Sequence, residues 1–314
     1  MARHHELLPT VETVRWGYFD GSLAPVLTIA SGDTVTLHSL SGGPEDLPPD
    51  GFAATVRDDH RQFLASAARG PGPHLVTGPV AVDGAMPGDA LVVEILDVAL
   101  RDDWGFNVIK PLGGALPGEF PFNRHMHLPL DRSKGSIRMP WGLIIPARPF
   151  FGVMGTAPPR HWGRITSIVP RSFGGNIDNK ELVAGTTLVL PVHEPGALFS
   201  AGDGHAVQGD GEVCLTAVET GLIGTFRLSI VKAAGIAMPR AETPDHLITM
   251  GFDEDLDDAV KQALREMIGL ICERTNLDAE QAYRLCSLVA DLRVTQIVNQ
   301  HKGAHMMLPR YALQ

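Results

Sequence analysis

Residues 202–212 read Gly-Asp-Gly-His-Ala-Val-Gln-Gly-Asp-Gly-Glu, which places three acids, one histidine and one glutamine among four glycines. The flanking runs, residues 186–192 and 213–219, are apolar and rich in β-branched side chains, so we expect two buried strands joined by this segment. Glycine lets the backbone adopt φ > 0 and approach a ligand closely, which allows the acids and His205 to face one point. Carboxylates and an imidazole that converge are typical ligands of a divalent metal, whereas a solvated acidic turn is the alternative interpretation.

The composition is that of a folded protein with many turns. The chain has 314 residues, with 44% hydrophobic residues, 34 glycines and 24 prolines. This length suits one large domain or two smaller ones, and the turn residues favour strands over a helical bundle. We predict an α+β fold that is mainly β: a sandwich or barrel-like core in residues 1–238, and a C-terminal α/β portion in residues 239–314 that packs on it to form one catalytic unit.

Charge and cysteine usage narrow the class of partner. The net charge is −10 and no basic run appears, which argues against nucleic acid. The first residues are charged and lead into no apolar segment, and no stretch approaches a membrane span. Three cysteines, Cys214, Cys272 and Cys286, are odd in number and far apart, as in reduced proteins. We therefore expect a cytoplasmic protein with a small neutral substrate and no membrane partner.

The N-terminal half carries short alternating runs that are typical of strands. Residues 26–29 and 34–37 are separated by Ser31-Gly32-Asp33, which predicts a β-hairpin. We expect a short helix within residues 52–68 and strands over 74–82 and 90–96. Residues 101–148 are irregular in pattern, and a segment of this length between clear strands predicts a wall or lid over a site.

Two further polar groups are candidates for the site. His125 and His127 lie two residues apart, on one face of a strand, as zinc ligands do. Without a nearby acid, we expect them to line a surface or cleft instead. Asp178 follows Gly174-Gly175-Asn176-Ile177, a sequence that also forms turns, and antiparallel pairing would bring it close to Asp203 and His205.

The last part of the chain has helical periodicity. Apolar residues recur at helical spacing from Leu256 to Ile271, after acids that suit a helix N-terminus. Asp278 and Gln281 form a capping-box pattern that predicts the start of a second helix. Two amphipathic helices of this kind most simply cover one face of a sheet.

Ordered motifs along nearly the whole chain, from about residue 29 to 309, resemble those of the acetamidase/formamidase family. The central segment 202–212 is the most specific of them. The others are His74-Leu75-Val76-Thr77-Gly78-Pro79, Asp103-Trp104-Gly105-Phe106, Gly174-Gly175-Asn176-Ile177-Asp178, Leu190-Pro191-Val192 and Val294-Thr295-Gln296-Ile297-Val298-Asn299.

This resemblance implies hydrolysis of a short linear amide, such as formamide or acetamide, to a carboxylate and ammonia. It also implies a β-rich fold with an appended α/β portion, a divalent metal, with zinc as the usual expectation, and a homodimer or higher homo-oligomer.

Amide hydrolysis requires a strong nucleophile, a group that stabilises the oxyanion and a proton donor. A divalent metal supplies the first two. No Gly-x-Ser-x-Gly elbow occurs, and the cysteines lie in apolar contexts, which disfavours a side-chain nucleophile. We interpret two residues as metal ligands, Asp203 and His205. Three others are candidates for further ligands or for residues that orient them: Asp178, His74 and Glu219.

The catalytic candidates are Glu212 and Asp210. Glu212 suits the general base, which takes a proton from water and passes it to the leaving nitrogen. Asp210 either shares in catalysis or orients the segment. His305, next to Gly303 in the family pattern, is a minor candidate.

Two other functions fit the same sequence. One is a β-sandwich that binds a metal or a sugar without catalysis, and the other is hydrolysis of a different C–N bond, such as that of a cyclic or larger amide. An EF-hand is excluded, because Asp203 and Asp210 are seven residues apart and strand-like runs flank them.

Overall fold

The molecule is built mainly from strands, as predicted, and the computed structural model describes residues 2–313. The largest sheet has nine strands, in which β1 and β5 pair in parallel and the other neighbours pair antiparallel. In spatial order its strands are β1 (His4–Leu7), β5 (Thr34–His38), β17 (Leu222–Val231), β7 (Ala90–Leu100), β15 (Thr187–Pro191), β18 (Arg240–Glu242), β19 (His246–Asp253), β21 (Lys302–Pro309) and β20 (Asp291–Gln296).

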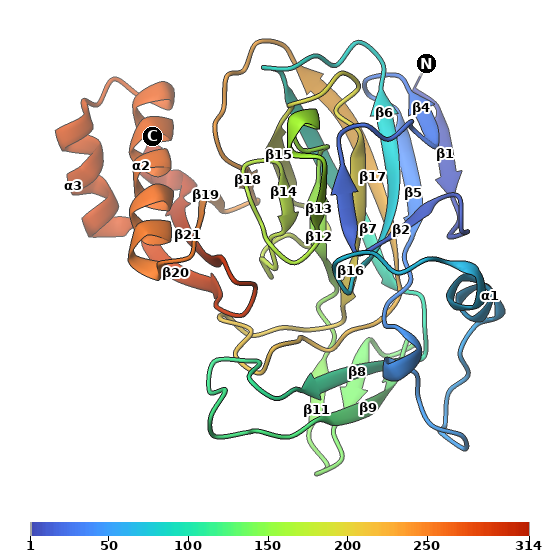
Figure 1. The fold of residues 1–314 in the computed structure, drawn as a ribbon. Helices are drawn as coiled ribbons and strands as arrows, with labels where there is room; N and C mark the ends of the chain where they lie inside the picture. Colours follow the sequence, from blue (N-terminus) through green and yellow to red (C-terminus); the bar gives the residue numbers. More distant parts are fainter. Residues whose placement is uncertain (1, 314) are drawn as a thin grey trace.

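A six-stranded sheet packs against the first part of the large sheet (Figure 1). Phe151 and Phe199 from this sheet contact Phe226 of β17, with ring centroids 5.4 and 5.6 Å apart, so one apolar core lies between the two layers. This is the sandwich that the sequence predicts. The strands of the second sheet are β14 (Gly174–Asn176), β12 (Phe150–Gly155), β16 (Phe199–His205), β6 (Leu75–Val82) and β2 (Val14–Trp16), with β4 (Leu27–Ile29) beside β6.

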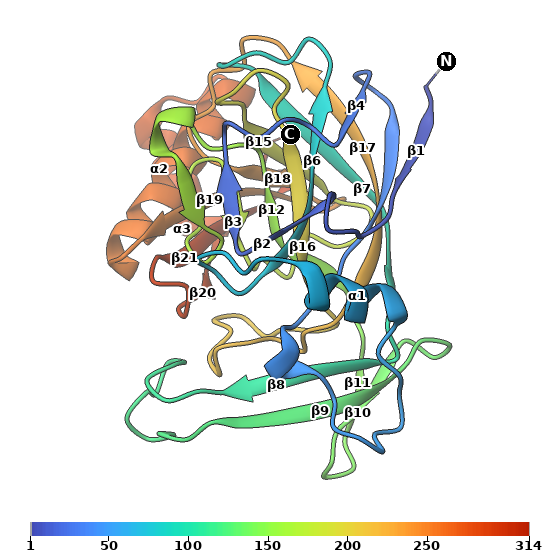
Figure 2. The same ribbon diagram turned by 45° about the vertical axis from the view of Figure 1, so that its right-hand side comes forward.

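The segment predicted to be an irregular wall is a third, antiparallel sheet. It lies below the sandwich in Figure 2 and is tied to it where Phe106 pairs with Glu219. Its strands are β8 (Trp104–Ile109), β9 (Arg124–Asp131), β10 (Ser136–Arg138) and β11 (Ile144–Pro146). The smaller elements are β3 (Tyr18–Asp20), which pairs with β13 (Arg164–Thr166), the helix α1 (Asp58–Ser66) and the 3₁₀ turns Pro44–Asp46, Arg160–Trp162 and Arg310–Leu313.

The C-terminal helices are confirmed. They are α2 (Leu256–Arg274) and α3 (Ala279–Val289), which lie at the β19–β20 end of the large sheet (Figure 1). The Asp278 side chain accepts a hydrogen bond from the backbone of Gln281, whose own side chain accepts one from the backbone of Asp278. Met267 and Ile271 are fully buried against Leu308, so the apolar face of α2 covers the strands β19 and β21.

The predicted hairpin of residues 26–37 is wrong. β4 pairs with β6 of one sheet and β5 pairs with β1 and β17 of the other, so the Gly32-Asp33 turn carries the chain between layers. The carboxylate of Asp33 accepts hydrogen bonds from the backbone of Arg3 at 2.7 Å and of Ala30 at 3.1 Å, which fixes this crossing. Alternation of apolar and polar residues predicts a strand, but it does not predict the strand with which it pairs.

The central segment is also built differently from the prediction. Residues 199–205 form the buried strand β16, whereas residues 213–219 form turns and not a strand. A Cβ atom at Gly202 would lie 2.2 Å from the Leu75 carbonyl oxygen, and one at Gly204 would lie 2.4 Å from that of Thr220. These two glycines therefore allow close packing within a sheet, and Asp203 and His205 alternate with them on one strand.

Among residues 2–313, no helix combines the length and the apolar character needed to cross a membrane.

Candidate metal centre

Three adjacent strands bring the acids and His205 together. Asp203 and His205 lie at the end of β16, and Asp178 follows β14. The strand between them is β12, where Gly152 lies opposite Asp203 and leaves the space that the three side chains share. A Cβ atom at Gly152 would lie 2.3 Å from Asp178 Oδ1, 2.8 Å from Asp203 Oδ2 and 2.7 Å from His205 Cε1.

The backbone at these positions is itself unusual. Asp178, Asp203 and Glu212 have φ of 50°, 56° and 47°, in the left-handed region that non-glycine residues seldom adopt. Strain of this kind persists where surrounding structure enforces it, and it concentrates at functional sites. Here it occurs at three acids that line the same cavity.

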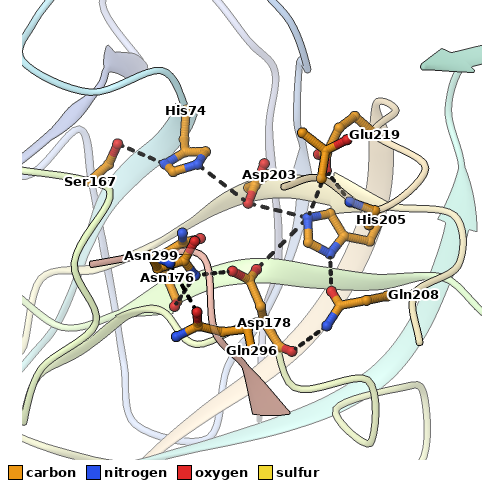
Figure 3. A network of polar contacts seen from close by, with 12 residues as sticks. His74, Ser167, Asn176, Asp178, Asp203, His205, Gln208, Glu219, Gln296 and Asn299 are labelled. Atoms are coloured by element: carbon orange, nitrogen blue, oxygen red, sulfur yellow. Dashed lines mark hydrogen bonds and ion pairs between the residues drawn. The ribbon is translucent and has the colours of Figure 1, made fainter. Parts of the chain in front are cut away.

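The His205 imidazole lies at the centre of the acids (Figure 3). Its Nε2 atom is 3.3 Å from Asp203 Oδ2, 3.3 Å from Glu219 Oε1 and 3.8 Å from Asp178 Oδ1. All four side chains are buried. Within residues 2–313 the ion-pair partners of these carboxylates are histidines, with no lysine or arginine in contact. Three buried acids around one imidazole leave an excess of negative charge.

Gln208 determines which nitrogen of His205 carries a proton. The Gln208 amide nitrogen donates to the Asp178 backbone carbonyl at 2.8 Å, so its Oε1 atom is the one that faces His205. That oxygen lies 2.9 Å from His205 Nδ1, which must therefore be the protonated donor. The remaining nitrogen, Nε2, faces the carboxylates, in the orientation of a metal-ligating histidine whose other nitrogen is held by a hydrogen bond.

Several buried polar atoms at this point have no hydrogen-bond partner within the described residues. They are Asp178 Oδ1, His205 Nε2, Glu212 Oε2 and Glu219 Oε2. The donor atoms of Asp178, Asp203 and His205 lie within 4.8 Å of one another, as do those of His205, Glu212 and Glu219. Oxygen and imidazole donors left without partners at this spacing fit a divalent cation.

The electrostatics reflect this crowding. Burial raises the pKa of Glu219 to about 8; Asp203 reinforces that rise and His205 opposes it. Burial and the nearby Asp178 raise the pKa of Glu212 well above its usual value. Burial acts in the same direction on Asp203, but His74 and His205 outweigh it and hold its pKa below the usual value. Neighbouring environments thus favour the charged form of one acid and the protonated form of others.

A cavity of about 360 Å³ opens beside these side chains. Its lining includes Asp178, Asp203, Glu212 and Glu219 at one end, with His74 next to them. Solvent and a small substrate therefore have access to the acids from one side.

The model of the acetamidase/formamidase family matches residues 23–167 and 163–311. The chain belongs to this family. It is 31% identical to the formamidase of Methylophilus methylotrophus over 193 residues, which cover 45% of this chain and 47% of that protein. The chain spans 47–64% of the length of the curated relatives it matches.

Solved structures agree over nearly the full chain. The acetamidase of Bacillus halodurans superposes with a TM-score of 0.84 at 31% identity, covering 98% of this chain and 97% of that one. The predicted acetamidase/formamidase of Thermoanaerobacter tengcongensis superposes with a TM-score of 0.87 at 25% identity, covering 100% and 98%. The α+β fold, mainly β, is therefore that of the acetamidase/formamidase family.

Five of the sequence-predicted site residues meet in this family member. Asp178 and Asp203 form one group with His205, and Glu212 and Glu219 form a second group with the same imidazole. His74 lies at their margin, with Nε2 3.8 Å from Asp203 Oδ2 and Nδ1 2.8 Å from Ser167 Oγ.

The other candidates lie elsewhere. Asp210 is exposed and pairs with Lys180 at 2.9 Å, outside the lining of the cavity. His125 and His127 stack on each other on β9 and contact Asp46, through its carboxylate and its backbone carbonyl respectively. His305 is buried on β21 with Nδ1 2.7 Å from Thr295 Oγ1. These contacts occupy the polar atoms of Asp210, His125 and His127 locally, whereas His305 Nε2 is buried without a hydrogen-bond partner among residues 2–313.

Sequence reasoning missed three contributors. Gly152 carries no signal in a run of apolar residues, since its role depends on the register of three strands. Gln208 belongs to the central segment but was given no role. Asn299 donates a hydrogen bond to Asp178 Oδ2, and its position at the end of the motif 294–299 was the available signal.

Proposed function

We propose that the protein is a metal-dependent amidase, which hydrolyses a linear amide to a carboxylate and ammonia. The observation that supports it is the set of buried, unpartnered carboxylate and imidazole donors beside a cavity, in a member of the acetamidase/formamidase family. Without a cation this concentration of buried negative charge destabilises the fold, so its presence argues for a bound metal.

We infer that zinc is held by Asp178, Asp203, His205 and Glu219. A divalent metal at such a site supplies a Lewis acid, which polarises a carbonyl group and makes water a stronger acid. Gln208 keeps the Nε2 lone pair of His205 directed at the donors, and Asn299 orients the Asp178 carboxylate.

Glu212 is the proposed general base. Its carboxylate lines the cavity next to the donors, and its Oε2 atom has no hydrogen-bond partner among residues 2–313. A cation bound beside Glu212 would counteract the neighbouring acids and favour its ionised form. The ionised carboxylate would accept a proton from the attacking water as the new C–O bond forms and return that proton to the amide nitrogen as the C–N bond breaks. The immediate products are a carboxylic acid and ammonia, which together carry all the atoms of the amide and the water, and the proton of the acid then passes to ammonia or solvent to leave the carboxylate.

Ammonia release tests the proposal. Formamide, acetamide and propionamide are incubated with the zinc-loaded protein, with and without a chelator, and we expect release that the chelator abolishes. A protein that binds zinc but releases ammonia from none of these amides, nor from longer ones, would instead be a binding module.

Glu212→Gln separates catalysis from metal binding. The amide side chain has nearly the same shape but cannot accept the proton, so we expect turnover to fall on the order of 10²–10⁴-fold. Zinc content measured by atomic absorption should stay the same. Glu119→Gln, in an exposed loop outside the cavity lining, is the matched control. An active Glu212→Gln protein would remove Glu212 from this role.

A cytoplasmic location and a homo-oligomer stay predictions. Cell fractionation checks the first, and light scattering after size-exclusion chromatography checks the second.

A further inference from the structure

The cavity beside the metal ligands is larger than a short amide requires. Its volume is about 360 Å³, within the range of sites that enclose drug-sized ligands. A water molecule occupies about 30 Å³ in the liquid, so an amide of three or four heavy atoms needs on the order of two to three such volumes. Formamide or acetamide would therefore fill only part of the cavity.

The lining of the cavity divides into two ends of different chemistry. The acids and His74 form the polar end described above. The rest of the lining includes five aliphatic side chains, Val108, Leu112, Ile168, Leu215 and Val298, together with polar ones such as Ser41, Asp46, Lys110 and Gln300. An apolar wall next to a few convergent polar groups is typical of sites that bind a ligand with both kinds of surface.

Leu215 is fixed relative to the proposed base. The Leu215 backbone N–H donates to the Glu212 carbonyl at 3.1 Å, so one tight turn presents both side chains to the cavity. This turn is anchored to β8, because the hydroxyl oxygen of Thr216 accepts from the Val108 backbone at 3.1 Å. Leu215 has φ of 92°, a conformation that is costly for a leucine and that places its side chain against the loop after β8.

Leu112 continues this wall toward the entrance. It also has a left-handed backbone, with φ of 61°, and its side chain is 85% exposed although it lines the cavity. The neighbouring Gly113 allows the loop to approach Leu215, whose Cδ2 atom would lie 2.9 Å from a Cβ atom there. Two strained leucines and Val108 thus form an apolar strip in the cavity that also holds Glu212, and Lys110 from the same segment lies in the lining beside them.

We propose that the substrate is a primary amide with an apolar acyl chain of about four to eight carbons, which lies along Val108, Leu215 and Leu112. This inference rests on the proposed amidase function and names its substrate class. The carbonyl carbon lies at the polar end, where water replaces ammonia, and the chain displaces water from the aliphatic strip.

A series of amides tests the substrate class. The specificity constant kcat/KM is measured by ammonia release for acetamide, propionamide, butyramide and hexanamide with the zinc-loaded protein. Each methylene that leaves water for an apolar wall should raise kcat/KM by about three- to fourfold, so hexanamide should exceed acetamide on the order of a hundredfold. If kcat/KM falls steadily as the acyl chain lengthens from acetamide to hexanamide, the chain-length inference is overturned while the amidase function stands. Release from no amide at all overturns the amidase function itself.

Leu215→Ala locates the binding surface. The substitution should lower the ratio of kcat/KM for hexanamide to kcat/KM for acetamide by about tenfold, because the acyl chain of the substrate loses its main contact. Leu112→Ala should lower the same ratio less, since Leu112 lies in solvent at the entrance. Leu116→Ala is the matched control, because this leucine lies in the same loop but outside the cavity lining, and it should leave the ratio unchanged. A ratio that responds equally to all three substitutions would overturn the assignment.

Discussion

The site strands β12, β14 and β16 differ in construction from the C-terminal layer of β19, β20, β21, α2 and α3. At the site, Asp178 and Asp203 occupy left-handed backbone, and within residues 2–313 the ion-pair partners of Asp178, Asp203 and Glu219 are histidines. In the C-terminal layer, regular helices begin at side-chain caps and bury aliphatic faces. The first region stores unfavourable interactions that a cation can relieve, and the second supplies stability.

The contrast predicts that substitutions in the two regions impair different properties of the protein. Changes at the site should remove metal binding and activity while the protein stays folded. Changes in the C-terminal layer should lower the free energy of unfolding while the folded molecules keep their activity.

The largest expected effect is that of Gly152→Ala. The added methyl group would meet Asp178 and Asp203 oxygens at 2.3 and 2.8 Å, so the donors must separate. We expect zinc affinity, measured by competition with a chromogenic chelator, to fall on the order of 100-fold or more, and activity to fall with it. Gly118→Ala, where nothing lies within 4 Å of the new atom, is the control. Unchanged zinc affinity would contradict the shared space that the site requires.

Met267→Ala should affect stability instead. Met267 is fully buried in the interface between α2 and the strands, and its truncation leaves a cavity. We expect the free energy of unfolding to fall by about 2–5 kcal/mol, measured by urea denaturation, with kcat per folded molecule unchanged. Met86→Ala, at a side chain that is largely exposed, should change little. A loss of kcat would show that the two regions are coupled more closely than the contrast implies.

His305, in the C-terminal layer, makes the stability of the protein depend on pH. Burial lowers the pKa of His305 to about 4, whereas the unfolded chain has a histidine near 6.5. Between these values the unfolded state binds a proton that the folded state does not, so stability falls as the pH drops from about 6.5 to 4, by about 3 kcal/mol in total. His305→Gln should remove this share of the acid destabilisation in urea titrations at several pH values. An unchanged pH profile would argue against a buried neutral imidazole.

The smallest expected effect is that of Asp278→Ala at the start of α3. It removes one member of the capping box, which should cost about 1 kcal/mol of unfolding free energy in the same urea assay. Asp278→Ser keeps an oxygen that accepts from the helix backbone and should restore most of the loss. If the unchanged protein, Asp278→Ala and Asp278→Ser have the same free energy of unfolding, the first turn of α3 does not contribute to the stability of the fold.

The same contrast explains which features the sequence could predict. The C-terminal helices follow from local rules, because caps such as Asp278 and a repeat of 3.6 residues act within one segment. The strand β16 was mistaken for a loop, since Gly202 and Gly204 resemble turn residues until the close approach of Leu75 and Thr220 is known.

Residue chemistry was sufficient to select acids that the fold brings close together. Asp178, Asp203, His205, Glu212 and Glu219 are the right types to bind a metal, and they meet. Asp210 has the same chemistry in the same segment but lies on its exposed side, beside Lys180. Its direction depends on the turn that follows β16, and spacing along the chain does not specify that turn.

The hydrogen bond from Asn299 to Asp178 has a consequence for protein engineering. Asn299 lies in the connection between β20 and β21, so the C-terminal layer extends one side chain into the acid cluster. A chimera that takes this layer from another family member must therefore also match that connection to the loop after β14. An exchange of the helices α2 and α3 alone leaves this contact intact. Its two junctions are best placed after Asp253, where β19 ends, and at Ala290, before β20 begins.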